Sequence, residues 1–116
     1  MPRLIDRHAL QSELADMPPP VLLEALPAKY FLDGHLPGAL HFPHERARAL
    51  APALVPDKAS AIVVYCASDT CQNSHIAAAT LESLGYSNVS VYAGGKRDWT
   101  EAGLAVVAGG TAQQAA

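Results

Sequence analysis

The clearest pattern along the chain is a run of five apolar residues, 61–65, that ends at Cys66 and is followed by a polar loop. A short, wholly apolar run is typical of a strand buried on both faces, as in a parallel sheet covered by helices. Beyond the loop, residues 74–84 carry apolar side chains at helical spacing, and Gly85 supplies a stop signal. The apolar stripe consists of Ile76, Ala77, Leu81 and Leu84. The centre of the chain is therefore predicted to be a strand, a polar loop and a helix.

The flanking segments predict further strands and helices in alternation. Asp6 is placed to cap a helix over residues 7–15. Strands are expected at residues 21–26, 39–42 and 88–92. Further helices are expected at residues 44–54 and in a short segment that contains Trp99, with a turn or short helix at 27–33. This alternation indicates a single α/β domain.

Length and composition narrow the class of protein. The chain has 116 residues, of which 50% are hydrophobic and 16% charged, as expected for one globular core. A net charge of -3 with few, scattered basic residues argues against a nucleic-acid partner. No apolar run approaches a membrane span and no secretory signal is evident, so we expect a cytoplasmic protein without a membrane partner. We place the domain at residues 1–108 and expect a disordered tail at 109–116.

Cys66 is the strongest candidate for chemistry. It is placed where the predicted strand ends and faces the start of the predicted helix. Unpaired amides at a helix N-terminus carry partial positive charge and stabilise an anion. A cysteine thiol in such a position has a lowered pKa and becomes nucleophilic. We therefore predict that Cys66 is a catalytic thiol, against the alternative of a buried structural cysteine.

The loop after Cys66 supplies a second thiol and several polar side chains. Cys71 is a candidate resolving or redox residue, provided that the chain brings its Cα within ~7 Å of that of Cys66; otherwise it is an ordinary loop residue. The predicted active-site loop consists of Ala67, Ser68, Asp69, Thr70, Gln72 and Asn73. With His75, the two cysteines make only three potential metal ligands, which is too few for a structural zinc site. We predict no metal and no organic cofactor.

Four stretches, in order, make the chain resemble the rhodanese family over roughly residues 21–109. They are Val21-Leu-Leu-Glu-Ala-Leu26, Gly34-His-Leu-Pro-Gly-Ala-Leu-His-Phe-Pro43, Val63-Val-Tyr-Cys66, and Val91-Tyr-Ala-Gly-Gly-Lys-Arg-Asp-Trp99 with Ala102-Gly-Leu-Ala-Val106. The resemblance implies a three-layer α/β/α sandwich around a mainly parallel sheet, with Cys66 as the active-site cysteine. It also implies that Cys66 takes a sulfane sulfur from a small donor as a persulfide and passes it to cyanide, a thiol or a partner protein's thiol. His35 is implied to be a structural residue of its loop.

Departures from the family pattern concern charge and loop length. The family's loop is usually basic, whereas here no Lys or Arg occurs between Cys66 and Lys96. The loop is about two residues longer than in ordinary sulfurtransferases and closer to that of rhodanese-fold phosphatases. Those enzymes need an oxyanion-binding Arg where this chain has Gln72. Glu24 and Leu26 replace the usual Asp and Arg, which predicts that a supporting ion pair is missing.

Taken together, these observations predict a rhodanese-like sulfurtransferase that works through a Cys66 persulfide. Two alternatives remain open. One is a thiol–disulfide redox protein that uses Cys66 and Cys71, and the other is a non-catalytic binding module with the same fold. Without a basic loop, a neutral or monoanionic persulfide or polysulfide suits the site better than thiosulfate.

Overall fold

A five-stranded parallel sheet forms the centre of the protein, and its strands lie in the order β1-β5-β4-β2-β3. The computed structural model describes residues 2–109. The strands are β1 (Arg3–Ile5), β2 (Val21–Glu24), β3 (Leu40–His41), β4 (Ile62–Tyr65) and β5 (Val89–Tyr92). The helices are α1 (Arg7–Leu14), α2 (Ala28–Asp33), α3 (Ala47–Leu54, preceded by the 3₁₀ turn His44–Arg46), α4 (Asn73–Ser83) and α5 (Gly95–Glu101).

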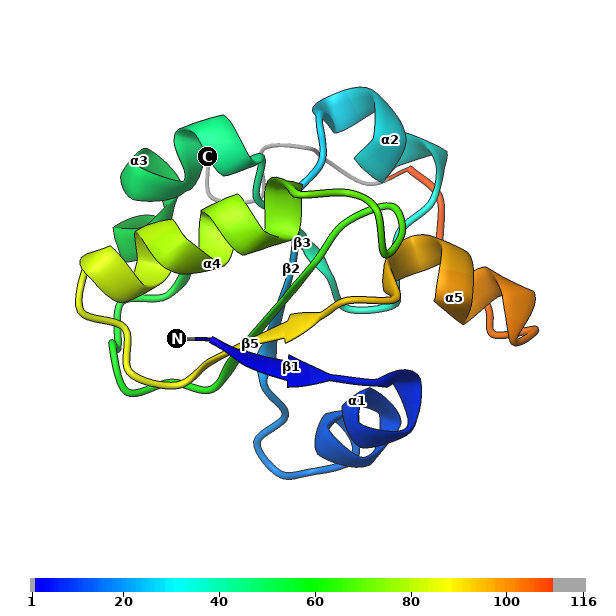
Figure 1. Ribbon diagram of the computed structural model, residues 1–116, viewed down its shortest axis with the longest axis horizontal. Coiled ribbons are helices and arrows are strands. Elements are labelled where there is room, and N and C mark those ends of the chain that lie inside the picture. The colour runs from blue at the N-terminus through cyan, green and yellow to red at the C-terminus, as the bar shows by residue number, and fades with distance from the viewer. Residues whose placement is uncertain (1, 110–116) are drawn as a thin grey trace.

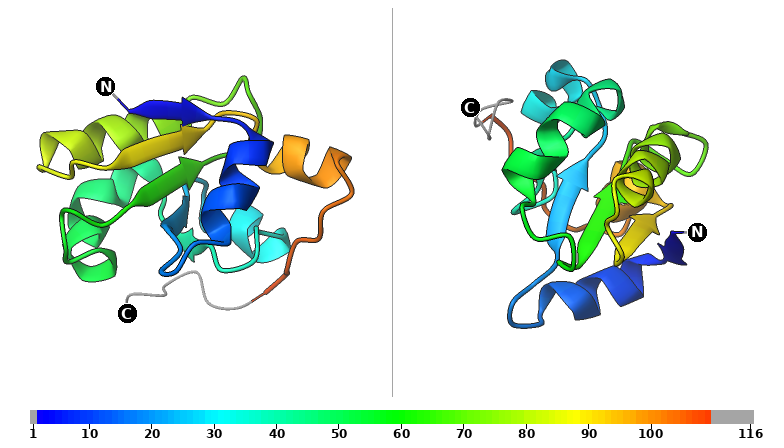
Figure 2. Two further views of the ribbon diagram at one scale, coloured as in Figure 1. Left: turned by 90° about the horizontal axis from the view of Figure 1, so that it is seen from below. Right: turned by 90° about the vertical axis from the view of Figure 1, so that its left-hand side faces the viewer.

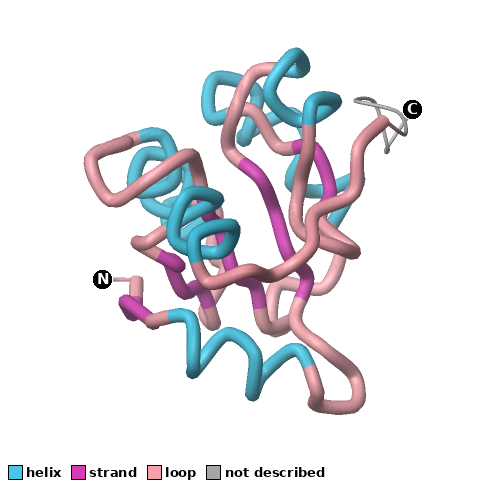
Figure 3. Tube along the Cα trace, turned by 90° about the vertical axis from the view of Figure 1, so that its right-hand side faces the viewer, coloured by secondary structure: helices cyan, strands magenta, loops and turns pink. Residues whose placement is uncertain are grey.

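Helices cover both faces of this sheet, as Figures 1 and 2 show. α3 and α4 lie on one face, where Val64, Ala77 and Leu81 belong to one buried cluster. α1 lies on the opposite face, where Leu10 packs with Trp99 of α5 in a second cluster. Figure 3 shows the strands between these helical layers. The chain is thus an α/β/α sandwich, as expected.

Strand alternation divides β4 between the two clusters. Ile62 and Val64 face α3 and α4, whereas Val63 and Tyr65 face the cluster that contains Trp99. All four β4 residues are buried, which explains why the segment is apolar throughout rather than alternating.

The predicted elements are confirmed, with local differences. Asp6 caps α1 by accepting a hydrogen bond from the Ala9 N–H at 2.8 Å. The predicted helix at 44–54 is divided into a 3₁₀ turn and α3. β1 was not predicted, because three residues are too few for a periodic signal; its pairing with β5 forms it. The predicted tail, 109–116, lies outside the described residues except for Gly109.

No helix in the described part of the chain is long and apolar enough to span a membrane. α4 has 11 residues, about half the length that a spanning helix requires.

Candidate functional site

Cys66 is the first residue after β4, at the carboxyl edge of the sheet. Ligands of open parallel sheets bind outside this edge, where the following loops begin. The Cys66 side chain is buried, and the residue is only 1% exposed. α4 begins at Asn73, so the short segment 67–72 connects the buried thiol position to a helix N-terminus. The predicted succession of strand, cysteine, loop and helix is confirmed.

The loop turns back on itself and brings the two cysteines together. The Cys71 N–H donates a hydrogen bond to the Ser68 carbonyl at 3.1 Å, which closes a turn. The Ser68 and Thr70 hydroxyls lie 3.1 Å apart on the outside of this turn. The Cα atoms of Cys66 and Cys71 are 6.3 Å apart, and the two sulfurs form a disulfide. This Cα separation is within the ~7 Å that a disulfide requires, a condition that the sequence could not test.

Backbone donors are left unpaired around this loop. Among the described residues, no protein acceptor bonds the peptide N–H groups of residues 67–70 or 72–75, in contrast to that of Cys71. Gln72 is the N-cap residue of α4 and its side chain does not cap the helix. Ser74 does not cap the helix either, because it lies buried within the first turn. These N–H groups are available to an anion at the loop.

The first turn of α5 packs directly on the Cys66 backbone. The Lys96 N–H donates to the Cys66 carbonyl at 2.9 Å, and the Arg97 N–H donates to the Ala67 carbonyl at 2.8 Å. Gly95 makes this approach possible: its φ is +67°, and a Cβ there would lie 2.5 Å from the Cys66 carbonyl oxygen. Glycine tolerates both the positive φ and the close contact. The Gly94-Gly95 segment therefore positions the end of β4.

A buried ion pair lies beside this contact. Glu24, at the end of β2, is 0% exposed and accepts a hydrogen bond from the Tyr65 hydroxyl at 2.6 Å. The Lys96 Nζ lies 3.2 Å from the second Glu24 oxygen and donates to the Tyr30 carbonyl at 2.9 Å. The prediction of a missing ion pair is wrong, because Lys96 of α5 supplies the cation. The Tyr65 hydroxyl in turn accepts from the Leu36 N–H at 3.0 Å.

Tyr65 acts in this network as a fixed hydrogen-bond donor. Burial, reinforced by the charge of Glu24 and the hydrogen bond to it, raises the pKa of Tyr65 far above its ordinary value. Tyr65 therefore remains protonated throughout the physiological range and ties the ends of β2 and β4 together.

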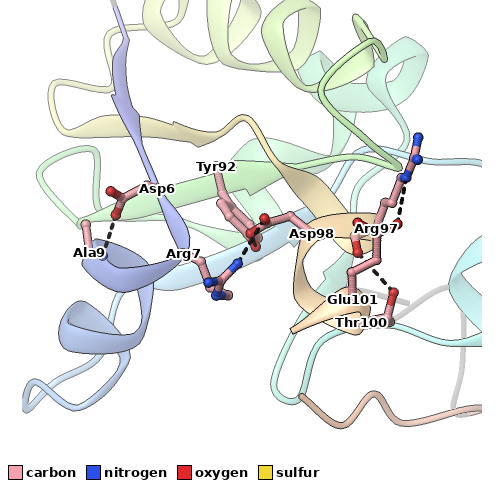
Figure 4. A network of polar contacts seen from close by, with 8 residues as sticks. All are labelled: Asp6, Arg7, Ala9, Tyr92, Arg97, Asp98, Thr100 and Glu101. Carbon is pink, nitrogen blue, oxygen red and sulfur yellow. Dashed lines mark hydrogen bonds and ion pairs between the residues drawn. The ribbon is translucent and has the colours of Figure 1, made fainter. Parts of the chain in front are cut away.

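A hollow of about 290 Å³ lies beside the loop on the side of α5. Its lining residues are Ser68, Asp69, Gly94, Arg97, Asp98 and Glu101. Figure 4 shows two of the carboxylates with their partners. Asp98 accepts from Arg7 at 2.9 Å and from the Tyr92 hydroxyl, and Glu101 accepts from Arg97 at 3.0 Å.

Arg97 is a basic residue at the loop that the sequence did not identify. Its hydrogen bond to Glu101 and the charges of Glu101 and Asp69 raise the pKa of Arg97. Lys96 and Arg97 are distant from Cys66 in sequence, and only the docking of α5 brings them near. Lys96 does not line the hollow, and the single basic residue of its lining, Arg97, shares it with the carboxylates of Asp69, Asp98 and Glu101, so the hollow is negatively charged overall.

The other predicted loop residues lie on the outside of the site. Ala67, Asp69, Thr70 and Gln72 are exposed, whereas Ser68 and Asn73 are half-buried. His35 is confirmed as a structural residue, since its Nδ1 lies 2.8 Å from the Phe31 carbonyl and its ring stacks on Phe31 at 3.8 Å.

The fold and the strand-end cysteine define a class of small α/β proteins with a cysteine at the carboxyl edge of the sheet. A family model of the rhodanese-like domain matches residues 7–102, and the chain belongs to that family. No curated protein matches the sequence at a significant level.

Solved structures of similar proteins agree with this assignment. The crystal structure of the Alr3790 protein from Anabaena sp. is 28% identical, with a TM-score of 0.83 over 95% of this chain and 96% of that one. Human single-domain sulfurtransferase TSTD1 is 26% identical, with a TM-score of 0.74 over 87% and 96% of the two chains. A rhodanese with anions from E. coli is also 26% identical, with a TM-score of 0.65 over 77% of this chain and 98% of that one.

The contact of Gly95 with Cys66 can be tested by adding a methyl group. Gly95→Ala introduces both a strained φ and a clash with the Cys66 carbonyl. Gly103→Ala is the matched control, because φ there is +81° but nothing lies within 4 Å of the new Cβ. We expect Gly103→Ala to lose about 1–2 kcal/mol of unfolding free energy in urea titrations. Gly95→Ala should lose a further ~1–3 kcal/mol from the clash. Equal losses in the two variants would contradict the proposed packing.

Because Glu24 is buried and Glu101 is exposed, we expect replacement of their partners, Lys96 and Arg97, to have different effects on the free energy of unfolding. Lys96→Met leaves the Glu24 carboxylate buried without its partner and should cost about 3–5 kcal/mol in the free energy of unfolding. Arg97→Met removes only an exposed pair with Glu101 and should cost less than about 0.5 kcal/mol. Adding Glu24→Gln to Lys96→Met should restore part of the loss, because the amide carries no charge. If Lys96→Met and Arg97→Met were equally mild, Glu24 would not depend on Lys96.

Proposed function

We propose that this protein is a sulfurtransferase in which Cys66 carries a sulfane sulfur as a persulfide. The observation that carries the proposal is the position of Cys66, a buried strand-end cysteine beside a loop and helix start with unpaired N–H groups. Membership of the rhodanese-like family and the similarity to a human single-domain sulfurtransferase support it.

The chemistry consists of two sulfur exchanges. The Cys66 thiolate attacks the outer sulfur of a donor R–S–SH, so that a Cys66–sulfur bond forms while the donor S–S bond breaks and RS⁻ leaves. An acceptor thiolate R′S⁻ then attacks the outer sulfur of Cys66–S–SH, forms R′S–SH and restores the Cys66 thiolate. No net oxidation occurs, and no cofactor takes part in either step.

Stabilisation of the two anions is the task of the backbone. The thiolate and the persulfide anion both gain from N–H donors and from the positive end of the α4 dipole, which are fixed before reaction.

Charge around the loop favours one donor class over another. Residues 67–73 contain Asp69 and no basic residue. Arg97 and Lys96 are paired with Glu101 and Glu24, respectively. A dianion such as thiosulfate meets more carboxylates than cations in the hollow beside the loop, whereas a neutral or monoanionic persulfide or polysulfide avoids this cost. We therefore propose a persulfide or polysulfide as donor, a small thiol, cyanide or a partner protein's thiol as acceptor, and the cytoplasm as the location.

The Cys66–Cys71 disulfide favours a second candidate, a thiol–disulfide redox protein that cycles between this bond and the dithiol. The two candidates differ in mass. Redox cycling removes two hydrogen atoms from the reduced chain, whereas persulfide formation adds one sulfur atom.

Sulfur loading provides the direct test of the first candidate. The reduced protein is mixed with glutathione persulfide, and its intact mass is measured without reductant. We expect Cys71→Ser to gain one sulfur atom. Cys66 is the one cysteine left in this variant, so its thiol must be the acceptor. Cys66→Ser should gain no sulfur, because its hydroxyl cannot form the persulfide. Loading that persists in Cys66→Ser would refute the assignment of Cys66.

Donor preference is the next prediction. With cyanide as the acceptor, turnover from glutathione persulfide should exceed turnover from thiosulfate by about tenfold or more, because an unpaired dianion near carboxylates is costly. Asp69→Asn should narrow this ratio by weakening the repulsion, whereas Asp16→Asn, an exposed change near α1, should leave it unchanged. Rapid thiosulfate turnover by the unmodified protein would contradict the proposed donor class.

A further inference from the structure

The disulfide establishes which sulfur atom Cys71 can reach. Its Sγ is bonded to the Sγ of Cys66, over a Cα–Cα separation of 6.3 Å. The loop turn between Ser68 and Cys71 holds this approach through the Cys71 N–H bond to the Ser68 carbonyl. When Cys66 carries a persulfide, its Sγ is the inner sulfur of that persulfide.

We propose that Cys71 is a second catalytic residue, which attacks the inner sulfur of the Cys66 persulfide and releases hydrosulfide. This inference rests on the proposed function, since it requires the Cys66 persulfide to form. Cys71 then acts as an internal nucleophile on the inner sulfur. It competes with an external thiol or cyanide that attacks the outer sulfur.

Atoms and electrons balance in this step. The reaction is Cys66–S–S⁻ + HS–Cys71 → Cys66–S–S–Cys71 + HS⁻. The bond between the Cys66 sulfur and the sulfane sulfur breaks, and the bond between the two cysteine sulfurs forms. The sulfane sulfur is reduced to sulfide by two electrons while the cysteine pair is oxidised to the disulfide, and the Cys71 proton leaves on hydrosulfide.

Two features favour this direction of attack. Attack on the inner sulfur expels hydrosulfide, which leaves readily because hydrogen sulfide is a stronger acid than an ordinary alkyl thiol. Cys71 belongs to the same loop and reaches the Cys66 Sγ directly, as the disulfide between them shows. Intramolecular placement converts the attack into a unimolecular step.

The product of this step is the disulfide state seen in the structure. Return to the dithiol then requires two electrons from a dithiol reductant, which would attack at the more accessible Cys71 sulfur. The partner that completes the cycle is therefore a reducing dithiol, and the net reaction is reduction of a persulfide to a thiol and hydrosulfide.

The experiment measures sulfide and protein mass together. The protein is reduced with dithiothreitol, desalted, and mixed with a limiting amount of desalted glutathione persulfide in the absence of reductant. Free sulfide is followed with time, and the thiol state is read from intact mass and from peptides prepared under non-reducing conditions. Cys71→Ser and Cys71→Ala are run in parallel, with Cys66→Ser as the background for the donor.

We expect the unmodified protein to release about one sulfide per persulfide supplied and to form the Cys66–Cys71 disulfide, at least about tenfold faster than either Cys71 variant. The Cys71 variants should keep the added sulfur on Cys66 and release it only when a thiol or cyanide is supplied. Reduction with dithiothreitol followed by desalting should return the unmodified protein to its dithiol, so that a second limiting portion of glutathione persulfide gives a second release of sulfide.

Other outcomes overturn the inference in distinguishable ways. If the unmodified protein keeps its persulfide as long as Cys71→Ser does, Cys71 does not attack it. If the sulfur moves to Cys71, the outer sulfur is the target and hydrosulfide is not the product. If no variant gains sulfur on Cys66, the proposed sulfurtransferase function fails as well.

Discussion

The peptide carbonyl of Cys66 joins the two halves of the site. It accepts the Lys96 N–H, so the first turn of α5 is fixed against the end of β4. The contact leaves no room for a side chain at position 95. Because the carbonyl is engaged on the α5 side, the Cys66 residue cannot shift along the strand direction without breaking that bond. The position of the sulfur, the start of the loop and the placement of the two basic residues of α5 all depend on this one packing arrangement.

The second constraint is that the basic residues of α5 are paired with carboxylates of the protein. This distinguishes the site from one that binds anions through free basic side chains. Glu24 is fully buried and requires Lys96, while Glu101 engages the exposed guanidinium of Arg97. The positive charges of α5 therefore stabilise carboxylates of the protein itself. What remains for a bound anion is the row of unpaired peptide N–H groups, which are neutral dipoles. Such donors suit a thiolate or a persulfide monoanion, and they compensate a dianion less well than a free Arg does.

In the proposed cycle, the loop also joins sulfur transfer to thiol–disulfide chemistry. The loop turns at Ser68–Cys71 and brings a second sulfur to Cys66. In a site whose nucleophile carries a persulfide, a neighbouring thiol changes the fate of that sulfur from storage to reduction. Sulfurtransferase and dithiol redox activity are therefore two stages of one cycle in our proposal rather than exclusive alternatives.

The sequence by itself determined the alternation of strands and helices, the strand-end position of Cys66 and the absence of a basic loop. Each of these is a local property, since it depends on apolar periodicity or on residues adjacent in the chain. Tertiary structure alone decided three features. β1 exists because β5 pairs with it, Glu24 finds Lys96 rather than lacking a partner, and Cys71 lies within bonding distance of Cys66. These depend on where the parallel strands and α5 bring distant residues, and on how a loop turns, which periodicity does not encode.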